Sequence, residues 1–548
     1  MDLRLAHWET VRPVGGPRGR LLAGGSGTEW GEALRAVLLA TAAALAVVSF
    51  APPPGDASAH LYRTWLVERG VIVWDNLWFA GNYPILTYSP LYYFLAAAAG
   101  NGMLTIAGAL VAAACFAALA VREWGPTAAW PARLFGICAA GPLITGTAPY
   151  GLGLAAALAC LLALQRRWWI PAFALAAVTL AFSALAFFFL VLALGAVALS
   201  RRCTIREVLT VGFVMAALAA CWATLWLLVP SQGRYPYSWL SLLAAGGVAA
   251  CGVRLALGTR SASLLAAFFG LWLVSCVVCY LVPTPMGETV TRLRYVVLPL
   301  MLLTVLHARA RPRWLAAIAL AGAAAYNTVP YAVSLALRVA GDGNAAEQGY
   351  WQPTIDFLRA NHSDDHLVAV VATGSHWESY YLPKAGIPVV RGWFRQTDMV
   401  RNEVLYDSSA DAGDYVRWLH DNAVRYVVLP DVRLDAYTGE REEDLVRAAA
   451  ADLALAMRTD DVTIYEVPNA TPLLTGPGRA RVTELTHDEV RGVVGASGTY
   501  RLRLTWSPYW RVVNGAITVR EATDGQMLLD ARKPGEFAIE VPAGALLP

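Results

Sequence analysis

The chain has 548 residues, of which 57% are hydrophobic and only 15% are charged, and its mean hydropathy is +0.47. These values lie above those of an ordinary soluble domain and predict a polytopic membrane protein whose first partner is the lipid bilayer. The net charge of +3 is nearly balanced, so it gives no reason to expect nucleic acid as a partner.

The N-terminal part of the chain divides into a short polar segment and a long apolar one. Residues 1–32 are rich in Gly and Arg and lack the pattern of a cleaved signal, so we expect a disordered cytoplasmic lead-in. Residues 33–338 contain eleven apolar runs, which we interpret as membrane spans although several are shorter than the ~20 residues of a straight crossing. The runs are Leu34–Phe50, Met103–Val121, Leu134–Thr147, Pro149–Leu164, Trp168–Phe182, Ala184–Leu199, Val208–Val229, Trp239–Val253, Ser263–Val282, Tyr295–Leu306 and Trp314–Leu335.

The distribution of arginines predicts the orientation of these spans. With the N-terminus in the cytoplasm, the cytoplasmic loops carry most of the Arg residues and the outer loops carry few, as the positive-inside rule requires. This count works only if Ser89–Gly100 stays at the outer surface as a juxtamembrane or re-entrant helix. The loop at residues 51–102 and the tail after Arg338 then lie outside together. The cytoplasmic arginines are Arg122, Arg133, Arg166, Arg167, Arg201, Arg202, Arg206, Arg254, Arg260, Arg309, Arg311 and Arg313.

The first outer loop carries a candidate catalytic acid. Three prolines end the first span, and the rest of the loop is too polar to cross a bilayer and too aromatic for an ordinary solvated loop, so we place it on the membrane surface. Asp56 precedes a predicted helix at Ala57–Glu68, and His60 lies one turn later on the same face. Asp56 is either the N-cap of this helix or a carboxylate that accepts a proton, and these residues alone favour neither.

A second charged group lies in the outer loop before the tenth span. Arg292 and Arg294 are on the outer side, where the orientation rule disfavours positive charge, and Glu288 could orient them. A guanidinium suits phosphate oxygens, but it can equally anchor the chain to anionic headgroups. The presence of an outer carboxylate at Asp56 favours the first interpretation, which is a site for a lipid phosphate.

The tail resembles a soluble α/β domain at residues 341–470 followed by a β-sandwich-like domain at residues 471–548. It has no G-x-G-x-x-G or P-loop motif, so we predict no nucleotide site. The loops Gly374–Glu378 and Gly392–Gln396 follow predicted strands and suit recognition of a polymeric acceptor. The predicted helices are Trp351–Ala360, Ala412–Asp421 and Glu442–Met457; the predicted strands are His366–Ala372, Ile387–Val390, Val424–Leu429, Val462–Val467, Tyr500–Thr505, Val512–Val519 and Phe537–Val541.

The membrane half is similar to a known superfamily. A first span that leads into a long outer loop with an early Asp, and then W-D-x-L-W, G-N-Y-P and Y-S-P-L-Y-Y, resembles the GT-C integral-membrane glycosyltransferases. The variant is similar to a bacterial branch whose name refers to 6-pyruvoyl-tetrahydropterin synthase, although the name implies no pterin chemistry here. The Arg-x-Arg-Tyr at 292–295 resembles a late-span element of such proteins. Family members often carry paired acids in the first loop, whereas this chain has G-D-A-S-A-H.

The resemblance implies an activity and a mechanism. It implies an inverting transfer of a sugar from a polyprenyl-phosphate donor to an extracytoplasmic envelope glycan or lipid, with Asp56 as base and the arginines holding the phosphate. Tyr83 and Tyr88 could stack on sugar or prenyl groups, although anchoring at the membrane interface is the commoner role of such aromatic residues. The sequence does not define a cofactor; Asp56, His60 and Asp75 could supply ligands to a divalent metal ion, but their spacing is not diagnostic of one.

Two other functions stay open. One is a transporter for a lipid-linked sugar, although the two halves show no repeat. The other is a non-catalytic scaffold for envelope assembly, which the single acid at Asp56 keeps in play. The scarcity of Lys beside abundant Arg and Ala indicates a GC-rich bacterial source, so we expect a bacterial plasma-membrane protein.

Overall fold

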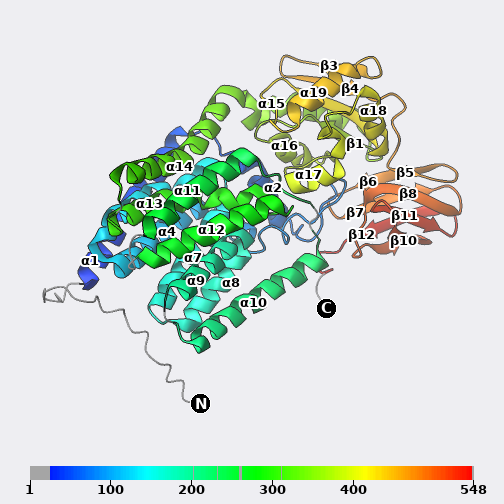
Figure 1. The fold of residues 1–548 in the computed structure, drawn as a ribbon. Helices are drawn as coiled ribbons and strands as arrows, with labels where there is room; N and C mark the ends of the chain where they lie inside the picture. Colours follow the sequence, from blue (N-terminus) through cyan, green and yellow to red (C-terminus); the bar gives the residue numbers. More distant parts are fainter. Residues whose placement is uncertain (1–24, 202, 231–232, 258–261, 310, 546–548) are drawn as a thin grey trace, which may run out of the picture.

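A computed structural model describes residues 25–201, 203–230, 233–257, 262–309 and 311–545. It shows a bundle of helices that carries two smaller domains at one end (Figure 1). Most of the predicted lead-in lies outside the described residues, and the first helix begins at Gly25. The structure confirms a polytopic helical membrane protein with a C-terminal α/β and β region.

The bundle contains one helix for each predicted span except the third, Leu134–Thr147. Eight helical stretches of the described residues are long and apolar enough to cross a membrane, and α8 and α9 are shorter apolar helices. The predicted span at Leu134–Thr147 is instead divided between α5 and α6, so a count of eleven spans stays a prediction. The helices are α1 (Gly25–Phe50), α4 (Asn101–Trp124), α5 (Ala129–Cys138), α6 (Gly141–Thr145), α7 (Ala148–Gln165), α8 (Trp169–Phe182), α9 (Ala184–Ser200), α10 (Ile205–Leu228), α11 (Trp239–Ala256), α12 (Ser263–Leu281), α13 (Arg294–His307) and α14 (Arg313–Gly341).

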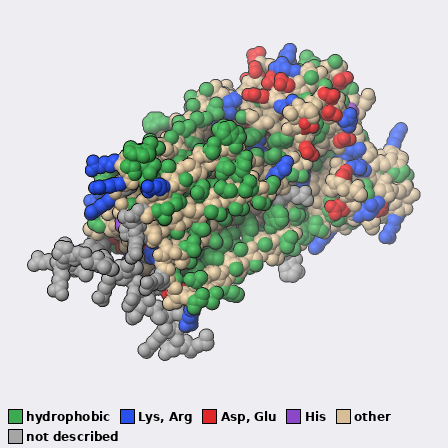
Figure 2. All heavy atoms as spheres, in the orientation of Figure 1, with side chains coloured by type: hydrophobic (Ala, Val, Ile, Leu, Met, Phe, Trp, Pro, Cys, Tyr) green, Lys and Arg blue, Asp and Glu red, His purple; other side chains and the backbone are tan. Residues whose placement is uncertain are grey.

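Small residues bring these helices close together. The first core cluster of the bundle is dominated by Ala from α1, α4, α5 and α11, and an added Cβ at Gly136 would come within 2.4 Å of the Ala36 carbonyl oxygen. Such side chains permit tight helix contact in a membrane. Large hydrophobic side chains instead face outward and form the broad apolar surface of Figure 2. This surface matches the lipid contact that the composition predicts.

The end of the bundle away from the two small domains is closed by paired charges. Arg133 donates two hydrogen bonds to Glu32, of 2.8 and 2.7 Å. Arg166 pairs with Glu29 and Arg201 pairs with Glu123. Three arginines that we predict to be cytoplasmic therefore lie together at the end where α1 begins. Which side of the membrane this end occupies stays a prediction.

The first outer loop folds as a structured layer between the bundle and the tail. Helix α2 spans Ala57–Glu68, as predicted, and α3 spans Tyr92–Ala99 inside the segment expected to be a surface helix. The loop between them is largely buried, including Trp74 and Trp78. It packs against tail residues, so it is not simply a layer on the lipid.

The α/β domain contains one four-stranded sheet in the order β1-β2-β4-β3. Strands β1 (Leu367–Val370) and β2 (Val424–Pro430) are parallel, whereas β4 (Val462–Glu466) and β3 (Ala454–Arg458) are antiparallel to their neighbours. The surrounding helices are α15 (Gln348–Asn361), α16 (Glu378–Lys384), α17 (Arg395–Arg401), α18 (Ala412–Asp421) and α19 (Gly439–Ala448).

Two predictions in this domain were wrong. The expected helix Glu442–Met457 ends at Ala448, because the chain at β3 pairs with β4 and sheet formation outweighs the helical propensity of its alanines. The expected strand Ile387–Val390 is reduced to isolated bridges, through which Val389 joins Val368 on one side and Trp78 of the outer loop on the other. The outer loop thereby extends the edge of the tail's sheet.

The last domain is a sandwich of two four-stranded antiparallel sheets, in the orders β10-β11-β8-β5 and β6-β7-β12-β9. Both sheets contribute to one hydrophobic core. The predicted strand Val512–Val519 was wrong, because Gly515 (φ +100°) turns the chain between the two sheets. The strands are β5 (Leu474–Thr475), β6 (Ala480–Leu485), β7 (Glu489–Val494), β8 (Gly498–Thr505), β9 (Arg511–Asn514), β10 (Ile517–Glu521), β11 (Gln526–Ala531) and β12 (Gly535–Glu540).

Candidate active site

Asp56 stands before α2 without acting as its cap. Its backbone (φ −91°, ψ 8°) is unlike that of a typical N-cap, and its side chain accepts no capping hydrogen bond. Gly146, at φ +82°, lies directly against it, and a Cβ there would come within 2.7 Å of the Asp56 nitrogen. The structure therefore does not support the N-cap interpretation, and the carboxylate stays available.

The proline run that leads to Asp56 is fixed by one arginine. Arg338, near the end of α14, donates to the carbonyl oxygens of Pro52 and Pro53 and, at 2.7 Å, to that of Ile144. Proline carbonyls receive no helical hydrogen bond here, so this side chain satisfies them. Arg338 thereby connects the residues after α1, helix α6 and helix α14. These bonds fix the backbone just before Asp56.

Four cationic or titratable side chains surround the Asp56 carboxylate. Burial raises the pKa of Asp56 above its ordinary value, and the charges of Arg292, His376, Arg338 and Arg63 oppose that rise. None of these groups forms an ion pair with Asp56 among the described residues. The carboxylate thus lies in a positive environment but has no direct partner, which suits a group that must take up a proton.

Arg292 and Tyr88 form the opposite wall. Arg292 lies in the 3₁₀ turn Gly287–Leu293, and its charge acts on both Asp56 and Tyr88. Burial raises the pKa of Tyr88, and Arg292, which hydrogen-bonds to this phenol, opposes the rise. Tyr88 therefore keeps its proton and can donate a hydrogen bond. Asp56, His60, Tyr88 and Arg292 are the four predicted site residues that the fold brings together.

His60 is a neutral member of this group. Its Nδ1 lies 3.0 Å from the Tyr93 hydroxyl, and its buried Nε2 has no hydrogen-bond partner. Burial and the charge of Arg63 lower the pKa of His60 to about 3. His60 therefore stays uncharged at neutral pH and can exchange hydrogen bonds but hold no charge there.

The other predicted site residues lie elsewhere. The Tyr83 hydroxyl is 2.9 Å from that of Ser507 in the sandwich domain. Glu288 accepts a hydrogen bond of 2.9 Å from Ser241 at the start of α11, so it does not orient an arginine. Arg294 donates to Thr291 at 3.3 Å, and its charge acts on tyrosines of the bundle, including Tyr326. A role in substrate binding stays a prediction for all three.

The proposed metal ligands do not form a group. Asp75 is completely buried, and it accepts hydrogen bonds from Tyr62 at 3.0 Å and from the Leu77 backbone at 3.1 Å, while His487 Nδ1 lies 2.8 Å from it. Within the described ranges, no cluster of three His, Cys, Asp or Glu side chains could hold a metal ion. Asp75 instead ties the outer loop to the sandwich domain.

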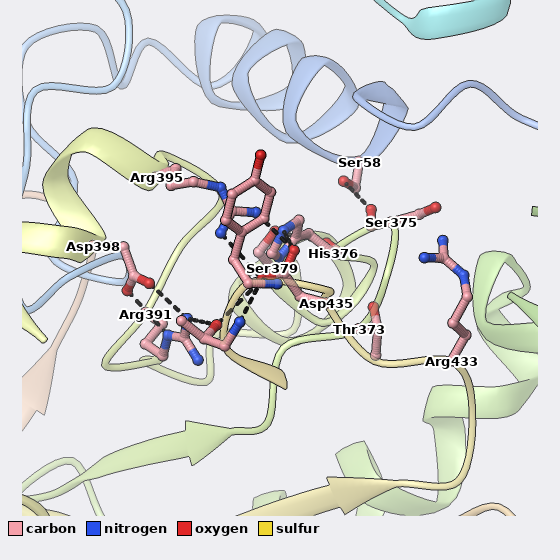
Figure 3. Close-up of polar contacts among 12 residues, drawn as sticks. Ser58, Thr373, Ser375, His376, Ser379, Arg391, Arg395, Asp398, Arg433 and Asp435 are labelled. Atoms are coloured by element: carbon pink, nitrogen blue, oxygen red, sulfur yellow. Dashed lines mark hydrogen bonds and ion pairs between the residues drawn. The ribbon is translucent and has the colours of Figure 1, made fainter. Parts of the chain in front are cut away.

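The soluble tail contributes residues to the same site. Because β1, the Val389 bridge and β2 run parallel, the loops after them meet at one edge of the sheet. His376 follows the first, Arg391 and Arg395 the second, and Asp435 the third. Ser58 of α2 donates to the carbonyl oxygen of Ser375 at 2.9 Å, which places this edge against α2 (Figure 3).

His376 is held between two carboxylates. Its Nδ1 lies 3.1 Å from Glu378 and its Nε2 lies 3.8 Å from Asp435. Burial alone would raise the pKa of Asp435, but hydrogen bonds from Arg395 and the charge of His376 hold it below its usual range. The backbone of His376 has φ +52°, a strained conformation for a non-glycine residue. The sequence shows the Ser-His pair but not the acids that the fold brings to it.

Two features of the site were not predicted from the sequence. Arg63 lies one turn after His60 on α2 and is buried there, and the helical spacing of Asp56, His60 and Arg63 was the signal that could have identified it. Trp393 and Phe394 of the tail lie within 6.0 Å, centroid to centroid, of Tyr88. No pattern in one sequence predicts that contact.

Comparison with known proteins adds structural matches only. No family model and no curated protein matched the chain. Among solved structures, the chain is similar to ArnT from Cupriavidus metallidurans in the apo state, with 14% sequence identity, over 83% of this chain and 100% of that chain. The TM-score is 0.46. A likeness of this degree does not define an activity, which depends on the geometry of the site.

Proposed function

We propose that the protein is a membrane glycosyltransferase that moves a sugar from a polyprenyl-phosphate donor to an extracytoplasmic envelope glycan or lipid, with inversion at the anomeric carbon. The resemblance of the membrane half to GT-C enzymes suggests the donor class. The observation that carries the proposal is the Asp56 carboxylate, which has no hydrogen-bond or ion-pair partner among the described residues and lies within the field of Arg292. A base and a cation at one outer site match what such a transfer needs.

The reaction assigns one role to each group. Asp56 accepts the proton of the acceptor hydroxyl as that oxygen attacks the anomeric carbon. The bond from the anomeric carbon to the phosphate oxygen breaks, and the phosphate leaves with its electron pair. Arg292 and the Tyr88 hydroxyl stabilise the charge on the departing phosphate. Because the phosphate leaves as an anion, no acid is needed to protonate it.

The surroundings support this chemistry. Buried aromatic rings of the outer loop and the tail enclose the site and limit water, which would compete with the acceptor. His60 is neutral and can orient a hydroxyl group through hydrogen bonds. The apolar bundle surface next to the loop offers a lipid donor an approach from the bilayer.

The test uses purified protein in lipid nanodiscs with a panel of polyprenyl-phosphate sugars, and it scores the release of polyprenyl phosphate. We expect turnover with at least one donor, and a loss of about 10²- to 10⁴-fold in Asp56→Asn, the range for removal of a general base. Size exclusion and thermal melting would show whether the variant folds. Turnover that survives in folded Asp56→Asn would exclude Asp56 as base. Donor binding without turnover would identify a carrier or scaffold instead.

A further inference from the structure

Arg63 is a buried cation without an anionic partner. Only 2% of its surface is exposed, and it forms no ion pair with a carboxylate among the described residues. Its Nε is buried and has no hydrogen-bond partner, while its Nη1 makes one long contact of 3.4 Å to the Tyr93 hydroxyl. A guanidinium has five N–H donors, so most of its hydrogen-bonding capacity is unused.

Aromatic rings from two parts of the molecule enclose this guanidinium. Its central carbon lies between 4.6 and 5.9 Å from the centroids of five rings. Three rings belong to the outer loop and two belong to the tail, although Tyr93 and Trp393 are 300 positions apart in the sequence. We call this group the Arg63 cage; its rings are those of Trp78, Tyr88, Tyr93, Trp393 and Phe394.

Contacts with the rings do not by themselves explain why the charged Arg63 is buried. Cation–π contacts offset part of the cost of burying a charge, but they leave the N–H groups without acceptors. In the tail, by contrast, the buried Arg391 forms ion pairs with Asp398 and Glu442. A buried structural arginine is normally paired with carboxylates in this way. Arg63 lacks such acids. The charge of Arg63 acts on the Asp56 carboxylate.

We propose that the Arg63 cage is an anion-binding subsite, shared between the outer loop and the soluble tail, that holds a phosphate group next to Asp56. This inference rests on the proposed function, in which the phosphate is that of the polyprenyl carrier. A phosphate there meets the free N–H groups of Arg63 and the hydroxyl of Tyr88, on the side where Arg292 also faces. The flat rings suit the first prenyl units or the sugar beside the phosphate.

The composition of the cage gives the tail a part in binding. Trp393 and Phe394 lie in the loop that follows the Val389 bridge, and the next residues, Arg395 and Gln396, tie this loop to Asp435 and to the Pro285 carbonyl oxygen of the bundle. The cage is therefore complete only when the tail is seated on the outer loop. A tail that moves away would leave Arg63 exposed on one side.

The experiment measures binding of three ligands to the full-length protein in nanodiscs, which are polyprenyl phosphate, neutral polyprenol and inorganic phosphate. We expect Arg63→Met to weaken binding of polyprenyl phosphate about tenfold or more, the loss that follows from removing charged hydrogen bonds, and to leave polyprenol unaffected. The matched control is Arg69→Met, because Arg69 lies at the end of the same helix but is exposed and stacks on Trp65 at 4.3 Å. It should bind all three ligands like the wild type.

Further variants separate the outcomes. If Arg63→Met does not fold, Arg63→Lys decides, because a lysine keeps the charge but lacks the planar fork, and we expect a smaller loss of affinity. Trp393→Leu should weaken the same ligand through the tail side of the cage. Wild-type affinity for polyprenyl phosphate in a folded Arg63 variant would overturn the inference, as would the absence of phosphate binding by the wild type.

The same measurements distinguish this inference from the proposed function. Arg63-dependent binding of polyprenyl phosphate without turnover would support the subsite and exclude the transferase. Turnover that depends on Asp56, with wild-type affinity in Arg63→Met, would support the transferase and exclude the subsite. Arg63-dependent binding of inorganic phosphate alone would support an anion site whose ligand is free phosphate, and it would exclude the lipid carrier.

Discussion

The two ends of the helix bundle differ in whether their charged side chains have partners of opposite charge. At the end where α1 begins, each of the three arginines Arg133, Arg166 and Arg201 has a glutamate as a direct partner. At the end that carries the tail, Arg63 is buried and Asp56 is partly buried, but neither forms an ion pair among the described residues. Charges of the first kind close a structure, whereas charges of the second kind are costly to the fold and indicate a binding or catalytic site.

The most direct test of the difference between the two ends is to remove the cation Arg292, whose charge acts on Asp56. We expect Arg292→Met to lower the rate of polyprenyl phosphate release about 10²-fold, because an electrostatic contact that is worth most in the transition state is lost. Single-turnover kinetics in nanodiscs would measure it. Arg294→Met is the matched control, since Arg294 faces the tyrosines of the bundle, and it should retain most of the activity. Equal losses in both variants would contradict the assignment.

The pH dependence of turnover sharpens the same point. Asp56 acts as the carboxylate, and burial raises its pKa, so kcat/KM should fall tenfold per unit as the pH drops below that raised pKa. Because Arg292 opposes the rise, Arg292→Met should raise the pKa further and move the acid limb of the profile to higher pH. A profile measured on wild type and this variant would show the shift. An unmoved limb would mean that another group titrates.

At the paired end of the bundle, loss of a charge should affect stability rather than activity. Glu32→Gln removes the negative charge and one of the two oxygens that accept hydrogen bonds from Arg133, and we expect it to lower the free energy of unfolding by about 1–2 kcal/mol. Reversible unfolding in detergent would measure this value, with the exposed Glu536→Gln as control. Turnover of the folded Glu32 variant should equal that of the wild type, and a specific loss would place a functional group at this end.

Two tyrosines of the outer loop give the smallest expected effects. Tyr83→Phe loses one hydrogen bond to Ser507, so stability should fall by about 1 kcal/mol and turnover should be unchanged. Tyr88→Phe loses the hydroxyl that faces Arg292, so turnover should fall while stability changes little. Melting curves and release rates of the two variants would show whether one residue belongs to the domain interface and the other to the site.

Local signals in the sequence predicted the elements that depend on local physics. Three prolines and an amphipathic pattern define α2, and α18 and β2 follow the predicted bounds almost residue for residue. The failures came where distant pairing decided the structure. The alanines before β3 favour a helix, but β4 provides a partner strand. The Asn-Gly pair at 514–515 signalled a turn, which the apolar residues on both sides concealed.

The same distinction between local signals and distant contacts applies to the residues of the site. Asp56 and His60 were accessible from helical spacing, and Arg292 was accessible because the predicted orientation puts its charge on the side where positive charge is disfavoured. Glu288 was misread because its partner, Ser241, lies in another helix, and the capping of α11 is visible only in three dimensions. The acids at His376 and the rings around Arg63 come from loops that only the assembled sheet brings together.

The hydrogen bonds from Arg338 to the proline run couple distant parts of the chain. This one side chain fastens the last helix of the bundle to the backbone from which Asp56 projects, and α14 leads directly into the soluble domain. Four residues after Arg338, Asp342 pairs with Arg433 at 2.9 Å and accepts a hydrogen bond from Ser375. A tilt of α14 would therefore move Asp56 and the adjoining loops of the soluble domain together.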